Sequence, residues 1–258
     1  MIFIVGGKGL TGSALVSYLK NHDTEFKIIQ RETKEEFFGK ECDVLIYANG
    51  NALKYKANAE PYFDFIASTS SIAEYVHKIK YKKFVLLSTI DVYNKTNLEK
   101  FSSEDIKINP KELSVYGYHK WLGENYVKRF CKEFLIFRLS GLVGIGLKKN
   151  PVYDFINKGK KVMTSPNSEM NFINTNKVAD AVFEILKKNI SNEVFNLASS
   201  KNIQIKDIKK IVGFDSEFLD NIESNIQIYK INTKKIAKII SLSSSENAIR
   251  EYYNSLQQ

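Results

Sequence analysis

Three glycines spaced three residues apart directly follow an apolar run at the start of the chain. Ile2–Val5 is typical of a buried strand, and Gly9–Lys20 has the pattern of a helix. Between them the sequence contains Gly6-x-x-Gly9-x-x-Gly12. Glycines at these positions allow a tight turn and a close approach of the backbone to a pyrophosphate, which then lies at the N-terminus of the helix. Strand, turn and helix together predict a dinucleotide-binding unit.

The alternation of short β-branched runs and helical patterns continues through the first 145 residues. It predicts a parallel sheet with helices on its faces, a Rossmann-like doubly wound α/β fold. The further expected strands are Lys27–Gln30, Val44–Ala48, Phe84–Ser88 and Phe134–Leu139, and the expected helices are Pro61–Lys80 and Tyr116–Cys131. Between Arg31 and Asp43 only a short helix fits, around Lys34–Lys40. We therefore expect one edge of the sheet to lack a strand.

After Gly146 the pattern becomes weaker. Helices are expected at Val152–Lys158, Val178–Lys188 and Glu246–Leu256, and a strand at Val194–Leu197. We predict a dinucleotide-binding Rossmann domain at residues 1–145. Residues 146–258 are expected to complete the sheet and to form a small C-terminal substrate-binding lobe.

Composition excludes several classes of protein. No apolar run reaches the roughly 18–20 residues that span a bilayer, and the N-terminus has no signal-peptide pattern. Cys42 and Cys131 show no metal-binding or redox spacing. We expect a cytoplasmic protein with no membrane partner and no metal site. The formal charge is +9, but the basic residues are scattered in pairs without an aromatic platform, so we expect no nucleic-acid partner.

Tyr116 and Lys120 stand four residues apart on an expected helix, so their side chains share one face. An ammonium beside a phenol favours the phenolate and lowers its pKa. Bringing a tyrosine from about 10 to neutrality takes roughly 3 pKa units, or about 4 kcal/mol, which is more than one lysine is expected to supply. A cationic cofactor ring nearby would help. The pair therefore indicates acid–base chemistry beside a nicotinamide.

The residues after the second expected strand indicate which dinucleotide is bound. An NAD site places an acidic residue there to hold the ribose 2′-hydroxyl. Here the chain has Gln30 and then Arg31, which can pair with a 2′-phosphate through two hydrogen bonds. Lys8 in the glycine loop can add a second positive charge. We expect NADP as the cofactor, with NAD as the second choice.

Five ordered motifs resemble those of the extended short-chain dehydrogenase/reductases, the family of NAD(P)-dependent sugar epimerases, dehydratases and 4-keto-sugar reductases. The resemblance is continuous from Met1 to about Gly144 and weaker beyond. The motifs are Gly6-x-x-Gly9-x-x-Gly12, Asp43-Val-Leu-Ile-Tyr-Ala48, Phe84-Val-Leu-Leu-Ser-Thr89-x-x-x-Tyr93, Tyr116-x-x-x-Lys120 and Arg138-Leu-Ser-Gly-Leu-Val-Gly144.

The resemblance implies a role for each matched residue. Tyr116 is the expected general acid/base, and Lys120 is expected to bind the nicotinamide ribose and to lower the pKa of Tyr116. Thr89 is expected to hydrogen-bond the substrate oxygen, and Asp91 is a further substrate-binding candidate. The cofactor-binding candidates are Gly6, Lys8, Gly9, Leu10, Gly12, Arg31, Ala48, Asn49, Gly50, Tyr116 and Lys120.

The chain also departs from the family pattern. Where the family often carries an Asn on the helix before the fourth expected strand, this chain has Phe65, with Asp64 and Ser68 nearby. Sugar dehydratases follow the Thr with an Asp-Glu pair, whereas Ile90-Asp91 follows here, which argues against dehydration. We expect His119 to lie on the helix surface.

The motifs and the resemblance together predict an NADPH-dependent reductase of a keto group, with a (deoxy)sugar nucleotide as the substrate that the resemblance implies. An NAD-dependent nucleotide-sugar epimerase is the first alternative, because the same site can perform that reaction. A cofactor-sensing or RNA-binding protein without catalysis is an alternative of another class. The family often forms homodimers, and the sequence identifies neither the substrate nor the oligomeric state.

Overall fold

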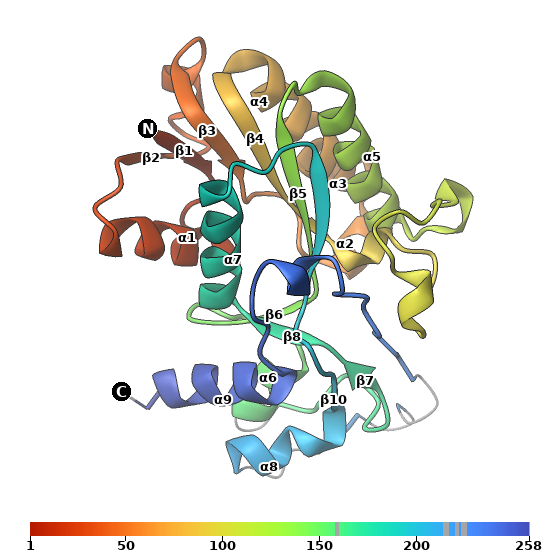
Figure 1. Ribbon diagram of the computed structural model, residues 1–258. Helices are drawn as coiled ribbons and strands as arrows, with labels where there is room; N and C mark the ends of the chain where they lie inside the picture. Colours follow the sequence, from red (N-terminus) through yellow and green to blue (C-terminus); the bar gives the residue numbers. More distant parts are fainter. Residues whose placement is uncertain (158–159, 214–216, 220–221, 223–225, 258) are drawn as a thin grey trace. The chain divides into compact units, whose positions relative to one another are not determined.

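The chain forms two compact units, and the computed structural model describes residues 1–157, 160–213, 217–219, 222 and 226–257 (Figure 1). The first unit comprises Met1–Asn94, Lys107–Arg138 and Ala179–Phe195. The second comprises Lys95–Ile106, Leu139–Val178 and Asn196–Gln258. Segments of the two units alternate along the sequence. The division into domains after residue 145 stays a prediction.

A six-stranded sheet with the strand order β2-β1-β3-β4-β5-β9 is the centre of the first unit. The pairs β1–β2, β1–β3 and β3–β4 are parallel, and Val5 is aligned with Ile29 and Tyr47. The strands are β1 (Ile2–Val5), β2 (Phe26–Ile29), β3 (Glu41–Tyr47), β4 (Lys80–Thr89), β5 (Phe134–Leu139) and β9 (Glu193–Leu197). The expected Rossmann-like α/β fold is confirmed.

The outer edge of the sheet is also as expected. Between β2 and β3 the chain forms only a 3₁₀ helix, η1 (Lys34–Phe37), and no strand in the described part of the chain extends the sheet beyond β2. β3 and β4 begin earlier than their apolar patterns indicate. Their polar N-terminal residues already pair, starting with Glu41 opposite Lys80. Pairing between two strands leaves no apolar pattern, so the sequence does not reveal these ends.

Helices flank the sheet and bring the later segments to it. They are α1 (Leu10–Asn21), α2 (Lys54–Ala59), α3 (Pro61–Phe65), α4 (Ser71–Lys78), α5 (Val115–Phe130) and α7 (Thr175–Lys187). The helix expected at Pro61–Lys80 contains one π-helical segment, η2 (Ile66–Ser70), between α3 and α4. This segment lies against α5. Helix α2 was not expected.

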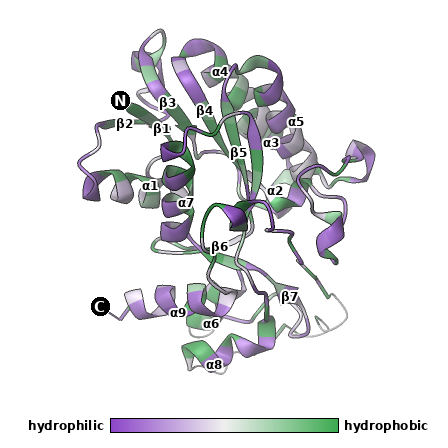
Figure 2. Cartoon of the chain, viewed as in Figure 1, coloured by the Kyte–Doolittle hydropathy of each residue, from purple (hydrophilic) through white to green (hydrophobic). Residues whose placement is uncertain are grey.

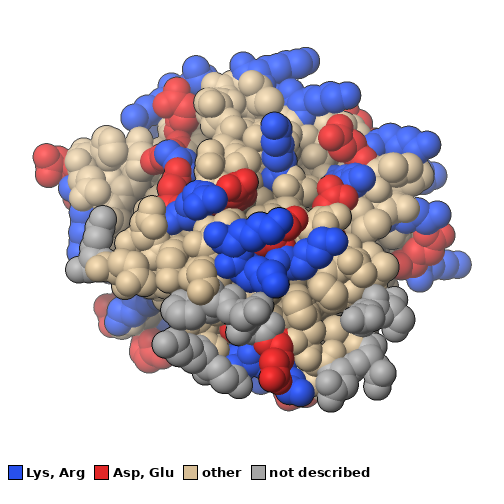
Figure 3. Space-filling view, turned by 90° about the horizontal axis from the view of Figure 1, so that it is seen from below, with Lys and Arg blue, Asp and Glu red and all other residues tan. Residues whose placement is uncertain are grey.

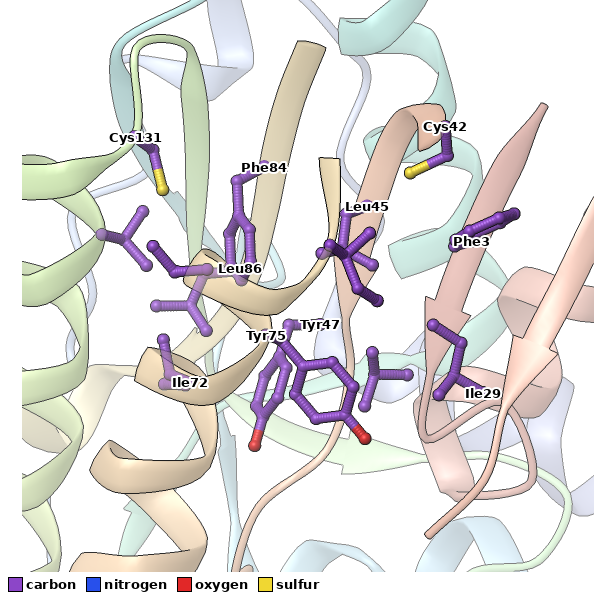
Figure 4. Close-up of a cluster of buried hydrophobic side chains, with 14 of the residues drawn as sticks. Phe3, Ile29, Cys42, Leu45, Tyr47, Ile72, Tyr75, Phe84, Leu86 and Cys131 are labelled. Atoms are coloured by element: carbon purple, nitrogen blue, oxygen red, sulfur yellow. The ribbon is translucent and has the colours of Figure 1, made fainter. Parts of the chain in front are cut away.

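Strand residues alternate between the two faces of the sheet, and both faces are buried. Figure 4 shows one face, where Phe3, Leu45, Tyr47, Phe84 and Leu86 pack with Ile72 and Tyr75 of α4. Figure 2 shows the central parts of these strands in the hydrophobic colour. This continuous burial explains why the strands appear in the sequence as apolar runs without polar alternation.

A buried ion pair joins α5 to the sheet. The Arg138 guanidinium on β5 donates to both oxygens of Glu124, at 2.7 Å from Nη2 and 3.1 Å from Nε. Ser88 Oγ of β4 donates to the same carboxylate at 2.6 Å. Glu124 and Arg138 are fully buried, and Glu124 lies two helical turns beyond Tyr116 on the same face. The network therefore fixes the helix that carries the expected acid–base pair.

We predict that Arg138→Met lowers the free energy of unfolding by about 3–5 kcal/mol, because it leaves the Glu124 carboxylate buried without its cation. Arg250→Met is the control, since it breaks an exposed Arg–Glu pair of similar length, 2.8 Å to Glu246. That change should cost at most about 1 kcal/mol. Urea unfolding measures the free energy of unfolding of both variants. Equal losses would contradict the argument that burial of Glu124 makes the loss of Arg138 costly.

The second unit contains short elements around small sheets. Strand β6 (Gly141–Val143) pairs in parallel with β8 (Phe172–Asn174), and β7 (Glu169–Met170) pairs antiparallel with β10 (Ile203–Gln204). The helices are α6 (Pro151–Ile156), α8 (Lys209–Val212) and α9 (Ser245–Ser255). α9 packs on β8, and the Ser245 hydroxyl accepts from the Phe172 amide at 3.0 Å. The helices expected at 152–158 and 246–256 are present as α6 and α9, although Lys158 lies outside the described residues.

The surface carries both signs of charge. On the face shown in Figure 3, Lys and Arg side chains are interspersed with Asp and Glu. Several ion pairs join exposed groups one helical turn apart, such as Glu184 with Lys188. Among the helices of the described residues, none has the length and apolarity needed to cross a membrane.

Candidate active site

The strand order reverses between β1 and β3, and open parallel sheets bind ligands at such a point, beyond the carboxyl ends of the strands. The glycine loop leaves the end of β1 and leads into α1. Ala48, Asn49 and Gly50 leave the end of β3, next to it. The first unit therefore brings together the two segments that the sequence assigns to the cofactor.

The glycine loop is a tight turn that leaves no room for side chains. Gly6 has φ +81°, a conformation that favours glycine, and its carbonyl accepts from the Gly9 amide at 2.9 Å. A Cβ on Gly6 would lie 2.8 Å from the Ala48 carbonyl oxygen, and a Cβ on Gly12 would overlap the Gly6 carbonyl oxygen. Gly9 is the N-cap of α1, whose first turn has no acidic residue. This backbone fits a pyrophosphate held by helix amides.

Gly50 makes room for the lysine of the acid–base pair. Its φ is +128°, and a Cβ there would lie 2.6 Å from Lys120 Nζ. Lys120 thus reaches from α5 to the segment after β3. The glycine loop, this segment and Lys120 form one continuous set of groups that fits a dinucleotide.

Arg31 and Lys8 are both exposed, on the loops after β2 and β1. The two loops are adjacent, because these strands are parallel neighbours and the Gly6 amide donates to the Ile29 carbonyl at 3.4 Å. Burial raises the pKa of Tyr75 to about 12, and Arg31 is close enough to oppose that rise. Both cations therefore lie on neighbouring loops after β1 and β2, where the adenosine end of the dinucleotide is expected.

Tyr116 and Lys120 lie buried on one face of α5. Lys120 Nζ is 5.6 Å from the centre of the Tyr116 ring. Ser114 caps the helix by accepting from the Gly117 amide at 3.2 Å. Gly117 allows the first turn to contact the backbone of residue 91, because a Cβ there would overlap the Asp91 carbonyl oxygen. This contact brings Tyr116 to the end of β4.

Thr89 ends β4, and its side chain is close enough to the Tyr116 hydroxyl to lower the pKa of that group. Its hydroxyl donates to Asp91 Oδ2 at 3.0 Å and accepts from the Asp91 amide at 3.2 Å. Asp91 Oδ1 accepts from the Lys54 ammonium of α2 at 2.6 Å. The structure thus joins three predicted residues and adds Lys54. No sequence pattern marks Lys54, because it stands 37 residues from its partner Asp91.

The spacing of Tyr116 and Lys120 suggests a lowered pKa for the tyrosine, whereas the structure gives a raised one. Burial raises the pKa of Tyr116 well above its ordinary value, Asp91 and Asp64 raise it further, and the hydrogen bond with Thr89 lowers it in part. Burial lowers the pKa of Lys120 to about 8, and the Asp64 carboxylate opposes this. The protein groups alone therefore keep Tyr116 in the phenol form, in which it can donate a proton.

The expectation that His119 lies on the helix surface was wrong. His119 is 7% exposed, and its Nδ1 lies 2.7 Å from Asp64 Oδ2. At the place where the family often has an Asn, Phe65 is partly exposed, whereas Asp64 and Ser68 are fully buried. A helical charged residue is usually solvated, so burial of Asp64 could not be read from its position.

Within the described residues no group of three or more His, Cys, Asp or Glu side chains is arranged to hold a metal ion. The polar groups of the site are hydroxyls, carboxylates and the ammonium groups of Lys54 and Lys120. They suit hydrogen bonding and proton transfer.

Solved structures with a similar fold cover the whole chain. A dTDP-4-dehydrorhamnose reductase from Clostridium acetobutylicum is 19% identical with a TM-score of 0.80, covering 100% of this chain and 99% of that one. The same enzyme from Bacillus anthracis, in complex with NADP, is 14% identical with a TM-score of 0.78, covering 98% and 97%. A UDP-glucuronic acid 4-epimerase mutant from Bacillus cereus, in complex with a fluorinated substrate analogue and NAD, is 19% identical with a TM-score of 0.78, covering 100% and 99%.

These identities are low, and the similarity to solved structures establishes the fold. No protein with a curated description matches the sequence. The model of the NAD dependent epimerase/dehydratase family matches residues 2–198, which include the glycine loop, Thr89, Tyr116 and Lys120. The chain is therefore an enzyme of the NAD dependent epimerase/dehydratase family, the extended short-chain dehydrogenase/reductases.

Proposed function

We propose that the protein is an NADPH-dependent reductase of a keto group carried by a (deoxy)sugar nucleotide. The main support is the state of Tyr116, a buried phenol whose pKa is raised by burial and by two carboxylates. Reduction of a ketone needs a proton donor at the carbonyl oxygen, and a phenol that stays protonated fills that role. An oxidation that starts from an alcohol would need the phenolate.

Tyr116, Thr89 and Lys120 each have a separate role in the proposed reaction. When bound, the cofactor supplies a hydride to the carbonyl carbon. Tyr116 gives its proton to the carbonyl oxygen, so that one hydride and one proton convert the ketone to an alcohol. Thr89 lies near the Tyr116 hydroxyl, and its own hydroxyl would orient the same oxygen by turning its proton from Asp91 to the substrate. Lys120 holds the nicotinamide ribose and carries the positive charge that stabilises Tyr116 after it has lost its proton.

NADPH is favoured over NADH by the charges near the adenosine end. Arg31 follows β2 where an NAD site would have an acid, and Lys8 lies on the adjacent loop. Both side chains are exposed and available to a 2′-phosphate. A phosphate carries two negative charges, and an Arg fork matches its geometry.

The substrate class rests on two observations. Structures of similar fold include reductases of a dTDP-linked 4-keto sugar and epimerases of UDP sugars. In addition, Thr89 is followed by Ile90 and Asp91, and the Asp91 carboxylate is engaged by both Thr89 and Lys54. A carboxylate held in this way is a poor acid for expelling water. Reduction without dehydration is the chemistry that fits.

The direct test mixes NADPH with a panel of 4-keto nucleotide sugars and follows absorbance at 340 nm. We expect NADPH oxidation with at least one substrate of the panel. Failure across the panel, together with NAD released from the purified protein and interconversion of UDP sugars, would favour the epimerase. Cofactor binding with no turnover of either kind would favour a sensor.

We expect Arg31→Ala to weaken NADPH binding about tenfold while leaving NADH binding nearly unchanged, because only NADPH carries the 2′-phosphate. Arg129→Ala is the control. It removes the same charge from an exposed position in the last turn of α5. Titration of cofactor fluorescence gives both dissociation constants. Equal loss of NADPH and NADH affinity in Arg31→Ala would contradict the assignment of Arg31.

A further inference from the structure

Asp64 is a fully buried carboxylate close to the acid–base pair. It lies on α3 and accepts three hydrogen bonds. Asn51 Nδ2 donates to Oδ1 at 2.8 Å, Ser68 Oγ donates to Oδ1 at 3.3 Å, and His119 Nδ1 lies 2.7 Å from Oδ2. A carboxylate is an acceptor, so Nδ1 of His119 carries the proton in this bond. Removing a charge from water is costly unless it is paired, so a buried carboxylate in this place requires an explanation.

Each donor to Asp64 belongs to a segment that builds the active site. Asn51 follows Gly50 at the end of β3 and also bonds the backbone of residue 53, with its Oδ1 accepting from the Leu53 amide at 2.8 Å. Ser68 belongs to the π-helical segment η2, which lies against α5. His119 precedes Lys120 on α5, and its carbonyl accepts from Thr69 Oγ1 at 2.9 Å. One carboxylate therefore ties together three segments that surround Lys120.

The same groups link Asp64 to the surroundings of the Lys120 ammonium. A Cβ on Gly50 would lie 2.6 Å from Lys120 Nζ and 3.9 Å from the Ser68 Oγ that bonds Asp64. Lys120 is buried, and no Asp or Glu of the described residues forms an ion pair with it within 4.0 Å. Asp64 is the carboxylate whose charge acts on it.

Three other ionisable groups in or near α5 have partners of their own. Asp91 of η3 (Ile90–Val92) is bound to Lys54 of α2, Glu124 of α5 is bound to Arg138, and His77 of α4 contacts the Tyr126 hydroxyl at 2.8 Å. The η2 segment contributes hydroxyls. The groups that face Lys120 and Tyr116 are therefore Asp64, His119 and Asp91.

We propose that Asp64 and His119 form a positioning pair for the Tyr116–Lys120 pair, in which Asp64 is the counter-charge of the Lys120 ammonium and His119 holds that carboxylate in place. The kinetic consequences of this proposal rest on the proposed function. Its physical content, the interaction of Asp64 with Lys120, is independent of substrate.

Asp64→Asn is the variant that tests the counter-charge. Asn has the same shape, and its oxygen can accept from Asn51 and Ser68. Its amide can donate to His119 Nδ1 once the ring proton moves to Nε2, so the variant keeps the hydrogen bonds needed for folding. Asp64→Ser replaces it if Asn is not tolerated. Asp43→Asn is the matched control, because Asp43 is exposed at the opposite end of β3 and bonds Lys82 and the N-terminus.

The titration of Lys120 is measured by NMR of protein with isotope-labelled lysine, with the Lys120 signal identified by its loss in Lys120→Met. In the native protein we expect a midpoint near pH 8. Asp64→Asn should lower the midpoint by roughly one pH unit, because removing a nearby negative charge disfavours the ammonium. Asp43→Asn should leave it in place. An unchanged midpoint in Asp64→Asn overturns the proposal, whatever reaction the enzyme performs.

Kinetics supply the second readout. Asp64 raises the pKa of both Tyr116 and Lys120, so Asp64→Asn should move the alkaline limb of the kcat profile for reduction to lower pH. His119→Leu should lower kcat roughly tenfold with little change in KM, and His119→Gln, which keeps an N–H donor, should recover most of it. The proposal would be contradicted if kcat fell equally in both His119 variants and the pH profile of kcat did not move in Asp64→Asn. Asp64 and His119 would then have a structural role only.

Discussion

Tyr116→Phe should lower kcat for reduction by about 10²–10⁴-fold while leaving the dissociation constant for NADPH unchanged. The change removes one hydroxyl, the proton donor, and keeps the ring that fills the buried position on α5. Because the aromatic ring stays in place, stability should fall by about 1 kcal/mol or less. Single-turnover oxidation of bound NADPH measures the chemical step, and thermal unfolding measures stability.

Tyr118→Phe is the matched control for this change. Tyr118 stands two residues further along α5 and is 37% exposed, so it points away from Thr89. Its hydroxyl should be dispensable, and kcat should stay close to that of the native enzyme. If Tyr116→Phe retained kcat within about threefold, a general-acid role would be excluded, since proton transfer by a positioned group contributes at least about a hundredfold.

The sequence predicted the parts of the site that depend on local pattern. The glycine loop, the strand ends at Ala48 and Thr89, and the i, i+4 spacing of Tyr116 and Lys120 each follow from a few adjacent residues. Strand ends of a parallel sheet meet at one edge, so these segments come together once the strand order is known. This explains why the fold and most candidate residues could be named without coordinates.

The contacts that set the charge of the site could not be predicted in this way. Asp64 and His119 are 55 residues apart, and Lys54 and Asp91 are 37 apart. Their pairing depends on how α2, α3 and the π-helical turn of η2 pack on α5, and no residue pattern marks that turn. The direction of the Tyr116 pKa shift could not be predicted either. The i, i+4 spacing indicates a neighbouring lysine, but it indicates neither burial nor carboxylates that are distant in the sequence.

The prediction that His119 lies on the surface of its helix was wrong. His119 follows Tyr118, which is partly exposed, and a polar side chain at such a position usually faces water. Here α3 covers it and supplies the Asp64 acceptor. The sequence of one helix does not show which of its residues will be buried by a segment from elsewhere in the chain.

Gly12→Ala should raise the dissociation constant for NADPH by about a hundredfold or more, which corresponds to about 2.7 kcal/mol. A Cβ at residue 12 would overlap the Gly6 carbonyl oxygen and lie 2.8 Å from the Gly6 carbonyl carbon and 2.9 Å from Gly7 Cα. These are backbone atoms that cannot rotate away. The turn must open, and its amides and the N-terminus of α1 then no longer converge on a pyrophosphate. Isothermal titration with NADPH measures the loss.

Gly39→Ala separates this effect from a general loss of stability. Gly39 has φ +78° and no atom within 4 Å of an added Cβ, so Ala there is strained without touching anything. It should cost about 1–2 kcal/mol of stability and leave NADPH binding unchanged. Overpacking at Gly12 costs a similar 1–3 kcal/mol. The two variants should therefore unfold at similar urea concentrations and differ in cofactor affinity alone. Gly12→Ala with native affinity would show that the turn is structural, and that the pyrophosphate is bound elsewhere.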